Sequence, residues 1–372
     1  MRAPLRILAV SAESLLPGYA AHAHMTAVMD ALRARGHAMA LVAQTDGAYH
    51  QSRIGRKLDR YRILHRAVLA RAEEADILYL RGHPALMPLA RELRRRNKRV
   101  VVELNGPPAE MVVTYPWLRP VRPLVQHLYV RLLRSADGIV AITPKLGALA
   151  ERLAPAVPVT VVGNGVDLNR FRPLEPDPAA KPYAVFFGSL ARWHGVTELL
   201  DAAGHALWPR GLDLVVAGDG QLGREVEAAT RRLSHCRWLG RVEHERMPDL
   251  VGRATLGISP VRRIAGRGLD DVSPLKLFEM MACGLPVVAS DMPGQTEPVT
   301  RFGGGLIYPS GDSTELARAV AQLFSDPALR RSMSLGARAA AEANDWNMKA
   351  AAIEGLLFQA LGAPDAKEAL AS

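Results

Sequence analysis

Two charged side chains stand out in a short apolar segment of the second half of the chain. From Leu269 to Asp291 the sequence reads LDDVSPLKLFEMMACGLPVVASD, in which Lys276 and Glu279 have mostly apolar neighbours. A cation in the first turn of a helix is unfavourable unless an anion is bound at that helix end. A carboxylate among apolar side chains needs hydrogen-bond donors, because an unpaired buried charge is costly.

A phosphorylated ligand with neighbouring hydroxyl groups would satisfy both side chains. The backbone amides near Ser273 to Leu275 and the Lys276 ammonium would bind its phosphates. Glu279 would accept hydrogen bonds from a vicinal diol such as a ribose. An alternative stays open here, in which Lys276 is solvated and Glu279 pairs with a nearby arginine.

The local sequence predicts the elements that position these two side chains. Ser273 is a favourable N-cap, Pro274 is a favourable first helical residue, and Cys283-Gly284 is a typical helix end. We therefore predict a helix over residues 274–283. The β-branched run at 287–290 predicts a buried strand directly after it.

The spacing of the acidic residues resembles a known family signature. Asp271, seven residues, Glu279 and the following MMACGLPVVASD are similar to the acidic-x7-Glu signature of the retaining glycosyltransferases of family 4, which have the GT-B fold. The resemblance implies that Glu279 binds the ribose of a nucleotide-diphosphate sugar. It also implies that Asp271, where the family usually has Glu, lies beside the donor sugar in the catalytic site.

A second segment, GSLARWHGV, starts at Gly188 and resembles the family's phosphate-binding loop. The family commonly has Arg and Lys where this chain has Ser189 and His194, and a Trp-His-Gly variant of the loop exists. The resemblance then implies that Lys276 is the main catalytic cation on the donor diphosphate, with Arg192 and His194 assisting. The alternative for His194 is a solvent-facing residue at the start of a helix.

Four more positions complete the expected site. Gly218 begins a Gly-Asp-Gly turn like that of the family, and the loop with Arg241 is where base recognition is expected. Asn105 replaces a family His that touches the donor sugar; it can bind a hydroxyl but cannot act as an acid or base. The loop around Gly18 lacks G-x-G-x-x-G, which disfavours an NAD enzyme. Gly18 fits close approach to a ligand, or a plain turn.

Length and periodicity predict an α/β protein of two domains. A chain of 372 residues is long for one core, and both halves alternate short apolar runs with helical stretches. Strands are predicted at 6–10, 38–43, 77–80, 99–104, 138–142, 157–162, 184–187, 212–217, 237–239, 256–258 and 287–290. Helices are predicted at 20–35, 84–97, 116–135, 144–153, 194–206, 221–232, 246–252, 274–283, 312–324 and 328–343.

The resemblance implies how these elements are divided. A GT-B protein has two doubly wound Rossmann-like domains with a crevice between them. Here the acceptor-side domain would span 1–168, a proline-rich linker 169–182 and the donor-binding domain 183–344, while a last helix in 345–372 would cross back to the first domain. In such sheets ligands bind outside the carboxyl ends of the strands, so the loops at Gly188, Gly218, Gly240 and 259–273 should gather there.

Charge is concentrated in the first half of the chain. Residues 1–172 hold 26 Lys+Arg and 13 Asp+Glu, a net of +13, and the remainder has a net of −3. The helix candidate around Trp117 to Arg134 mixes leucines with four arginines, which suits an anionic membrane surface. Solvated helix faces are the alternative. Nucleic acid is disfavoured, because no reader motif occurs and aromatic residues make up only 5%.

The remaining features narrow the class of protein. The two cysteines suit a reducing cytoplasm, no metal-ligand spacing occurs, and no apolar run reaches 18 residues. We therefore predict a cytoplasmic retaining glycosyltransferase without metal or other cofactor, peripheral at the inner face of the cytoplasmic membrane. It would move a sugar from a nucleotide-diphosphate sugar to a saccharide or lipid-linked acceptor in surface polysaccharide or glycolipid synthesis. A nucleotide-sugar epimerase and a non-catalytic donor-binding subunit are the alternatives.

Overall fold

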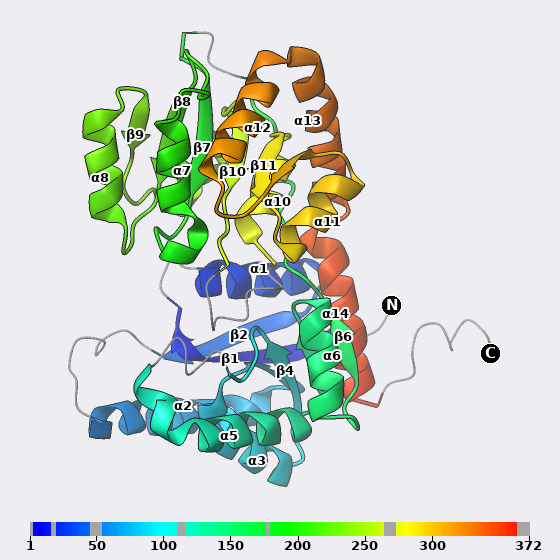
Figure 1. Cartoon of the computed structure of the whole chain (residues 1–372). Coiled ribbons are helices and arrows are strands. Elements are labelled where there is room, and N and C mark those ends of the chain that lie inside the picture. The colour runs from blue at the N-terminus through cyan, green and yellow to red at the C-terminus, as the bar shows by residue number, and fades with distance from the viewer. Residues whose placement is uncertain are drawn as a thin grey trace. The chain divides into compact units, whose positions relative to one another are not determined.

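The computed structural model describes residues 3–15, 20–44, 54–109, 116–175, 179–263 and 273–362. Gly18 and Asp271, both predicted site residues, lie outside these ranges. The chain forms two compact units, one of residues 1–163 and 346–372 and the other of residues 164–345 (Figure 1). Residues 164–168, which we assigned to the first domain, and the expected linker 169–182 therefore belong to the second unit.

The first unit is built on a parallel sheet with the strand order β2-β1-β3-β4-β5-β6. Side chains alternate between its faces, as the period of a strand requires: Leu8 and Val10 of β1 join the large core, while Ala9 joins a smaller cluster with Met25 and Met29. The strands are β1 (Arg6–Ser14), β2 (Ala38–Gln44), β3 (Ile77–Arg81), β4 (Arg99–Leu104), β5 (Gly138–Ala141) and β6 (Val159–Val161).

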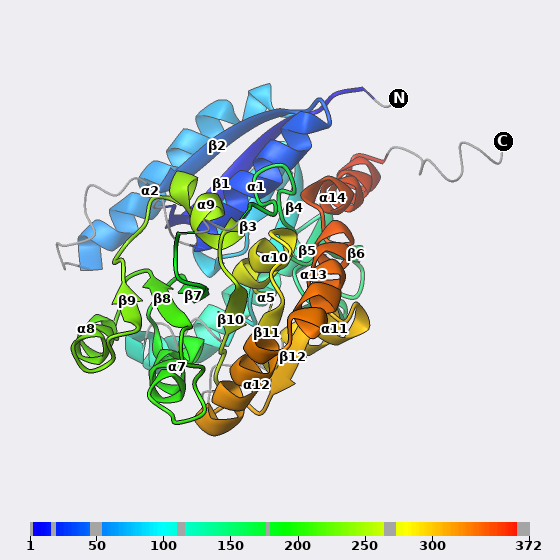
Figure 2. The same cartoon turned by 90° about the horizontal axis from the view of Figure 1, so that it is seen from above.

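Helices cover both faces of this sheet. The large-core face is covered by α2 (Ile54–Arg71), α3 (Met87–Arg95), α5 (Arg122–Arg134) and α6 (Pro144–Leu153). The other face is covered by α1 (Ala20–Ala34) and α14 (Trp346–Ala360), which pack side by side (Figures 1 and 2). Within the described residues, no helix is long and apolar enough to span a bilayer.

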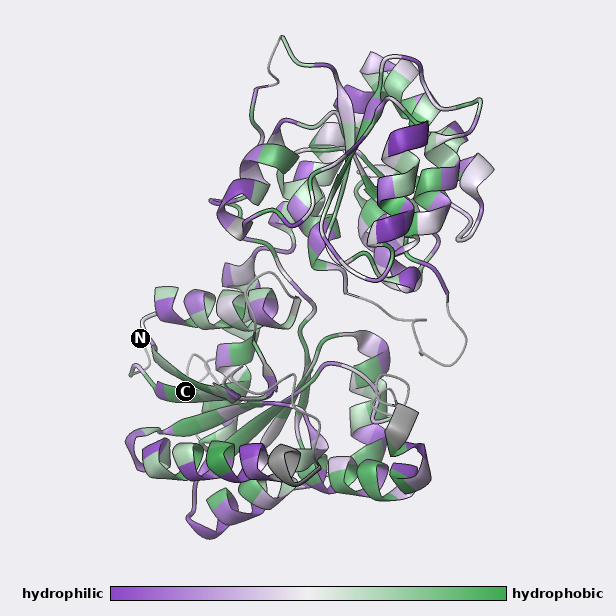
Figure 3. Ribbon diagram, turned by 90° about the vertical axis from the view of Figure 1, so that its left-hand side faces the viewer, coloured by the Kyte–Doolittle hydropathy of each residue, from purple (hydrophilic) through white to green (hydrophobic). Residues whose placement is uncertain are grey.

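The second unit repeats this plan with the strand order β12-β11-β10-β7-β8-β9, again parallel. In both units the strands are apolar and the outward helix faces hydrophilic (Figure 3). The strands of the second unit are β7 (Tyr183–Phe187), β8 (Asp213–Ala217), β9 (Cys236–Trp238), β10 (Leu256–Ser259), β11 (Val287–Ser290) and β12 (Gly305–Tyr308).

Two helical layers enclose the second sheet. One core joins it to α7 (Val196–Ala203), α8 (Gly223–Arg232) and α12 (Ser313–Ser325). The other core joins it to α9 (Met247–Gly252), α10 (Leu275–Ala282), α11 (Pro293–Arg301) and α13 (Pro327–Glu342). The predicted α/β architecture of two doubly wound sheets is confirmed, and α10 packs into an apolar core.

The structure differs from the predicted elements at a few points. Helices α2 and α11 and strand β12 were not among them. The predicted helix 116–135 is divided into a 3-10 turn, Pro116–Val121, and α5, because Pro120 and Pro123 lack the N–H that a continuous helix uses. The predicted helix 84–97 likewise begins with a 3-10 turn, Pro84–Leu86, before α3.

Candidate functional site

Loops that follow four strands of the second unit pack backbone against backbone at the carboxyl ends of the sheet. Gly218 N donates to Gly240 O at 2.6 Å. A Cβ atom at Gly218 would lie 1.9 Å from Gly188 O, and one at Gly195 would lie 1.7 Å from Pro260 O. Gly188, Gly195 and Gly218 have positive φ, which glycine adopts without steric cost. These contacts bring the loops at Gly188, Gly218 and Gly240 together, as the strand order predicts.

The helix α10 begins at this edge without a side-chain cap. It starts at Leu275, one residue later than predicted, and its N-cap is Pro274. Ser273 is not the N-cap: its Oγ accepts from Asn164 N at 2.8 Å, and its carbonyl accepts from Asn164 Nδ2. The predicted cap is wrong because Asn164 engages both oxygen atoms of Ser273. The amides of the first turn of α10 are left without a capping side chain.

Lys276 lies in that first turn and projects over the Gly188 loop. Its Nζ is 3.5 Å from the position of a Cβ on Gly188 and 4.5 Å from the centre of the Phe186 ring. The residue as a whole is partly exposed, but Nζ is buried and has no hydrogen-bond partner among the described residues. Burial lowers the pKa of Lys276 from 10.5 to about 7, although Glu279 acts to raise it. The alternative of a solvated Lys276 is therefore wrong.

Glu279 lies one turn further along α10, on the same side as Lys276. Within the described part of the chain its carboxylate forms no hydrogen bond and no ion pair, so the alternative of a paired arginine is not found there. Burial raises the pKa of Glu279 from 4.5 to about 7, although Arg170 and Lys276 act to lower it. Lys276 Nζ and the Glu279 carboxylate thus lie one turn apart, and neither has a hydrogen-bond partner among the described residues, as a phosphate-and-diol ligand would require.

The loop after β7 is fixed by its own backbone. His194 Nδ1 donates to Ser189 O at 2.6 Å, and Arg262 N donates to Trp193 O at 2.9 Å. Arg192 is exposed at the start of a short 3-10 turn, Arg192–His194. Ser189 and His194 are therefore held in the loop that also carries Gly188 beneath Lys276. Arg241 is exposed in the loop after β9.

Asn105 lies in the first unit, directly after β4, and its Nδ2 donates to Glu103 O at 3.4 Å. Glu103, which was not among the predicted site residues, is the centre of a buried polar network. Its Oε2 lies 2.8 Å from His24 Nε2 and accepts from Tyr79 OH at 2.5 Å, while Oε1 accepts from Arg81 at 3.2 Å. Burial alone would raise the pKa of Glu103, but His24, Arg81 and Tyr79 lower it to about 2.

Three further residues of the second unit contribute to the site and were not predicted from the sequence. Phe186 lies under the Lys276 ammonium, Asn164 anchors Ser273, and Arg170 acts electrostatically on Glu279. No group of three possible metal-ligating side chains occurs in the ranges that the structure describes; the expected absence of a metal stays a prediction.

Two doubly wound parallel sheets, one of which has glycine-rich loops beside the start of α10, define a two-domain α/β protein. Comparisons identify the family. Residues 21–170 match the family model for Glycosyltransferase Family 4, and residues 181–326 match the model for Glycosyl transferases group 1. The chain belongs to the glycosyltransferases of family 4.

Individual relatives and solved structures agree with this assignment. The chain is 28% identical over 202 residues to a GDP-mannose-dependent monoacylated alpha-(1-6)-phosphatidylinositol monomannoside mannosyltransferase of Corynebacterium glutamicum, covering 50% of this chain and 51% of that protein. The chain thus spans about half the length of this relative. It is also 28% identical to an alpha-maltose-1-phosphate synthase of Mycolicibacterium smegmatis, and that match covers 55% of this chain and 58% of the synthase. A sucrose-phosphate synthase from Thermosynechococcus elongatus shares the fold, with a TM-score of 0.74 and 17% identity over 95% of this chain and 98% of that one. The predicted GT-B fold is confirmed.

Proposed function

We propose that this chain is a retaining glycosyltransferase that moves a sugar from a nucleotide-diphosphate sugar to a saccharide or lipid-linked acceptor, in the synthesis of surface polysaccharide or glycolipid. The main support is the pair of unsatisfied charges on α10. Lys276 Nζ has no partner in the described residues, and Glu279 has no hydrogen bond there. A nucleoside diphosphate supplies both missing partners, with its phosphates at Lys276 and its ribose diol at Glu279.

Relatives support the class of donor. One relative is by name GDP-mannose-dependent, and one solved structure of the same fold, Anabaena HepE (19% identical, TM-score 0.69), contains UDP-glucose; it covers 95% of this chain and 99% of that chain. In the proposed reaction the bond between the sugar's anomeric carbon and the β-phosphate oxygen breaks, and the electron pair leaves with the diphosphate. The acceptor hydroxyl oxygen bonds to that carbon on the same face, and its proton passes to the departing phosphate.

Each residue has a proposed role in this reaction. The Lys276 ammonium and the first-turn amides of α10 stabilise the charge that develops on the leaving diphosphate, with Arg192 and His194 assisting. Glu279 orients the ribose. Asp271 positions the donor sugar without attacking it, Asn105 binds a sugar hydroxyl, and no metal takes part.

Product analysis tests this reaction. Purified chain is incubated with a panel of nucleotide sugars and a saccharide acceptor, and the anomeric configuration of the product is determined by NMR. We expect the donor's configuration to be retained; an inverted product would exclude the proposed mechanism. A parallel incubation without acceptor separates the alternatives, since an epimerase would convert the donor by itself and a non-catalytic subunit would bind the donor without turnover.

We also propose that the acceptor is presented at the anionic, cytoplasmic face of a membrane. The segment that contains α5 leaves Val121 43% and Leu124 56% exposed. Four exposed arginines flank these two side chains: Arg119, Arg122, Arg131 and Arg134. Each arginine near an anionic leaflet adds about 1 kcal/mol of binding free energy. Apolar and cationic side chains on one segment suit a peripheral membrane contact.

Co-sedimentation with liposomes tests the membrane proposal. Wild-type chain should bind anionic vesicles at low salt, bind neutral vesicles weakly and dissociate as salt is raised. Leu124→Glu should bind less, whereas Leu335→Glu, at a 75% exposed position of α13, serves as the matched control. Equal binding to neutral and anionic vesicles would leave a soluble acceptor as the better proposal.

A further inference from the structure

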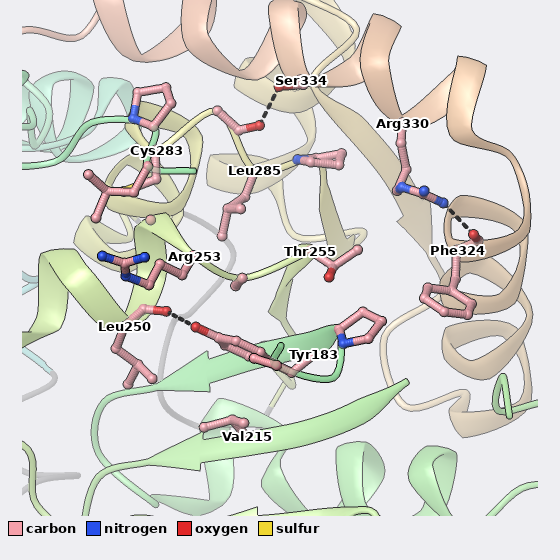
Figure 4. A pocket seen from close by; sticks show the side chains of 18 of the residues that line it. Tyr183, Val215, Leu250, Arg253, Thr255, Cys283, Leu285, Phe324, Arg330 and Ser334 are labelled. Carbon is pink, nitrogen blue, oxygen red and sulfur yellow. Dashed lines mark hydrogen bonds between the residues drawn. The ribbon is translucent and has the colours of Figure 1, made fainter. Parts of the chain in front are cut away.

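A cavity of about 960 Å³ lies in the second unit at the edge of the sheet opposite to Lys276 (Figure 4). Tyr183 is the first residue of β7, Thr255 directly precedes β10, and Pro286 directly precedes β11. The end of α12 and the first turns of α13 complete its wall. The loops of the donor site follow the other ends of these strands, so the cavity is a separate site.

The charged residues that line this cavity are all cationic. The described lining contains no Asp or Glu, although residues 164–345 as a whole hold 21 Lys+Arg and 22 Asp+Glu. Positive charge is therefore concentrated at this place in a unit that is nearly neutral. The cationic residues of the lining are Lys181, Arg237, Arg253, Arg330 and Arg331.

The structure fixes two of these arginines on opposite sides of the cavity, with Thr255 and Leu285 between them (Figure 4). Arg253 Nε donates to Asp249 Oδ1 at 2.9 Å. Arg330 donates to Leu323 O at 2.9 Å and to Phe324 O, at the end of α12. Arg237 Nε lies 3.5 Å from Asp213 Oδ2. The remaining two cations, Lys181 and Arg331, are exposed and form no ion pair with any described residue.

The lining between the cations is largely apolar and includes two aromatic rings. Tyr183 is held in place because its OH donates to Leu250 O at 2.6 Å. Phe324 lies beneath Arg330, whose guanidinium carbon is 5.8 Å from the ring centre. The Thr255 hydroxyl forms no hydrogen bond with a described residue, so it is available to a ligand. The cavity thus offers flat apolar surface together with anion-binding groups at its rim.

We propose that this cavity binds a phosphorylated small molecule with a flat ring, of the class of nucleoside monophosphates. Its volume is in the range of small-molecule sites, roughly 300–1,000 Å³. Arginine guanidinium groups bind phosphate oxygens in pairs, and the ring would lie against Tyr183 or Phe324. The occupant would contact Cys283 and Gly284 at the C-terminal end of α10, the helix whose first turn carries Lys276.

Calorimetric titration of a donor-site double variant, Lys276→Ala with Glu279→Ala, tests the proposal without interference from the donor site. AMP, UMP and inorganic phosphate are the probes. We expect one nucleoside monophosphate per chain to bind, and inorganic phosphate to bind at least about tenfold more weakly, because it lacks the ring. Adding Lys181→Glu or Arg331→Glu should weaken binding by about tenfold or more, since a charge-assisted contact becomes repulsive.

Arg224→Glu provides the matched control, because Arg224 is an exposed arginine of α8 outside the cavity lining. It should leave the titration unchanged. The proposal is overturned if no nucleoside monophosphate binds, if phosphate binds equally well, or if the charge reversals at Lys181 and Arg331 have no more effect than Arg224→Glu. Binding of an acidic peptide alone would also overturn it, in favour of a protein partner.

Discussion

Replacement of Lys276 by Met should stabilise the ligand-free chain while weakening donor binding. The Nζ is buried without a partner in the described residues, and its pKa falls from 10.5 to about 7. That fall corresponds to about 5 kcal/mol as an upper bound. Replacing a buried charge by an apolar side chain of similar volume stabilises proteins by about 1–4 kcal/mol, so we expect a gain of about 2 kcal/mol at pH 7.

The pH dependence of this gain has a definite sign. The folded-state pKa of Lys276, about 7, is below the value of 10.5 for an unperturbed lysine. Between these values the unfolded chain binds more protons, so wild-type stability should rise with pH across that window. The Met variant lacks this contribution. The difference in the free energy of unfolding between variant and wild type should be largest at and below pH 7 and shrink towards pH 10.5.

Denaturant unfolding at several pH values between about 6.5 and 9.5 measures this difference. Lys181→Met is the matched control, because that lysine is exposed, and its effect should stay within about 0.5 kcal/mol. Nucleoside diphosphate binding to Lys276→Met should weaken by more than about tenfold, since a charge-assisted hydrogen bond is lost. A destabilised variant, or a stability difference that does not vary with pH, would refute the assignment of Lys276 as a buried cation awaiting an anion.

Two further substitutions test how the units are held together internally. Gly218→Ala should destabilise the chain by more than about 2 kcal/mol in denaturant unfolding and reduce donor binding, because the new Cβ would lie 1.9 Å from Gly188 O. Gly211→Ala is the control: Gly211 also has positive φ, but its new Cβ would have no atom within 4 Å. This substitution should cost only about 1 kcal/mol. Glu103→Gln should cost about 3 kcal/mol or more in the same assay, because it disrupts a buried charged network. Glu73→Gln is the control: the Glu73 side chain is 66% exposed, so this substitution should cost less than about 1 kcal/mol.

Local sequence was sufficient to predict the helix that carries Lys276 and Glu279. The helix over 274–283 was predicted to within one residue at each end, because its apolar run stops at Gly284, whose φ of 69° is in the left-handed region. The wrong N-cap has a different origin. Ser273 is engaged by Asn164, 109 residues earlier, and no local pattern carries that information.

Other features depended on tertiary context in the same way. The helix α2 was missed because six basic residues interrupt its apolar face in IGRKLDRYRILHRAVLAR. The helix α11 contains Gly294 and Pro298, both poor in helix interiors, and its stability comes from burial of Gln295, Pro298 and Val299. Glu103 follows three valines in the strand RVVVEL, and nothing in that local pattern indicates polar partners. Its partners come from α1 and β3, which are distant in sequence.

The most direct test of the proposed donor site is titration of Glu279→Ala with a nucleotide-diphosphate sugar that the wild-type chain binds. If the Glu279 carboxylate accepts two hydroxyl hydrogen bonds, each worth about 1.5–3 kcal/mol, the dissociation constant should rise by at least two powers of ten while the variant stays folded. Glu297→Ala, an exposed carboxylate of α11, should bind like wild type. Unchanged donor affinity in a folded Glu279→Ala protein would contradict the assignment of α10 as the donor-binding helix.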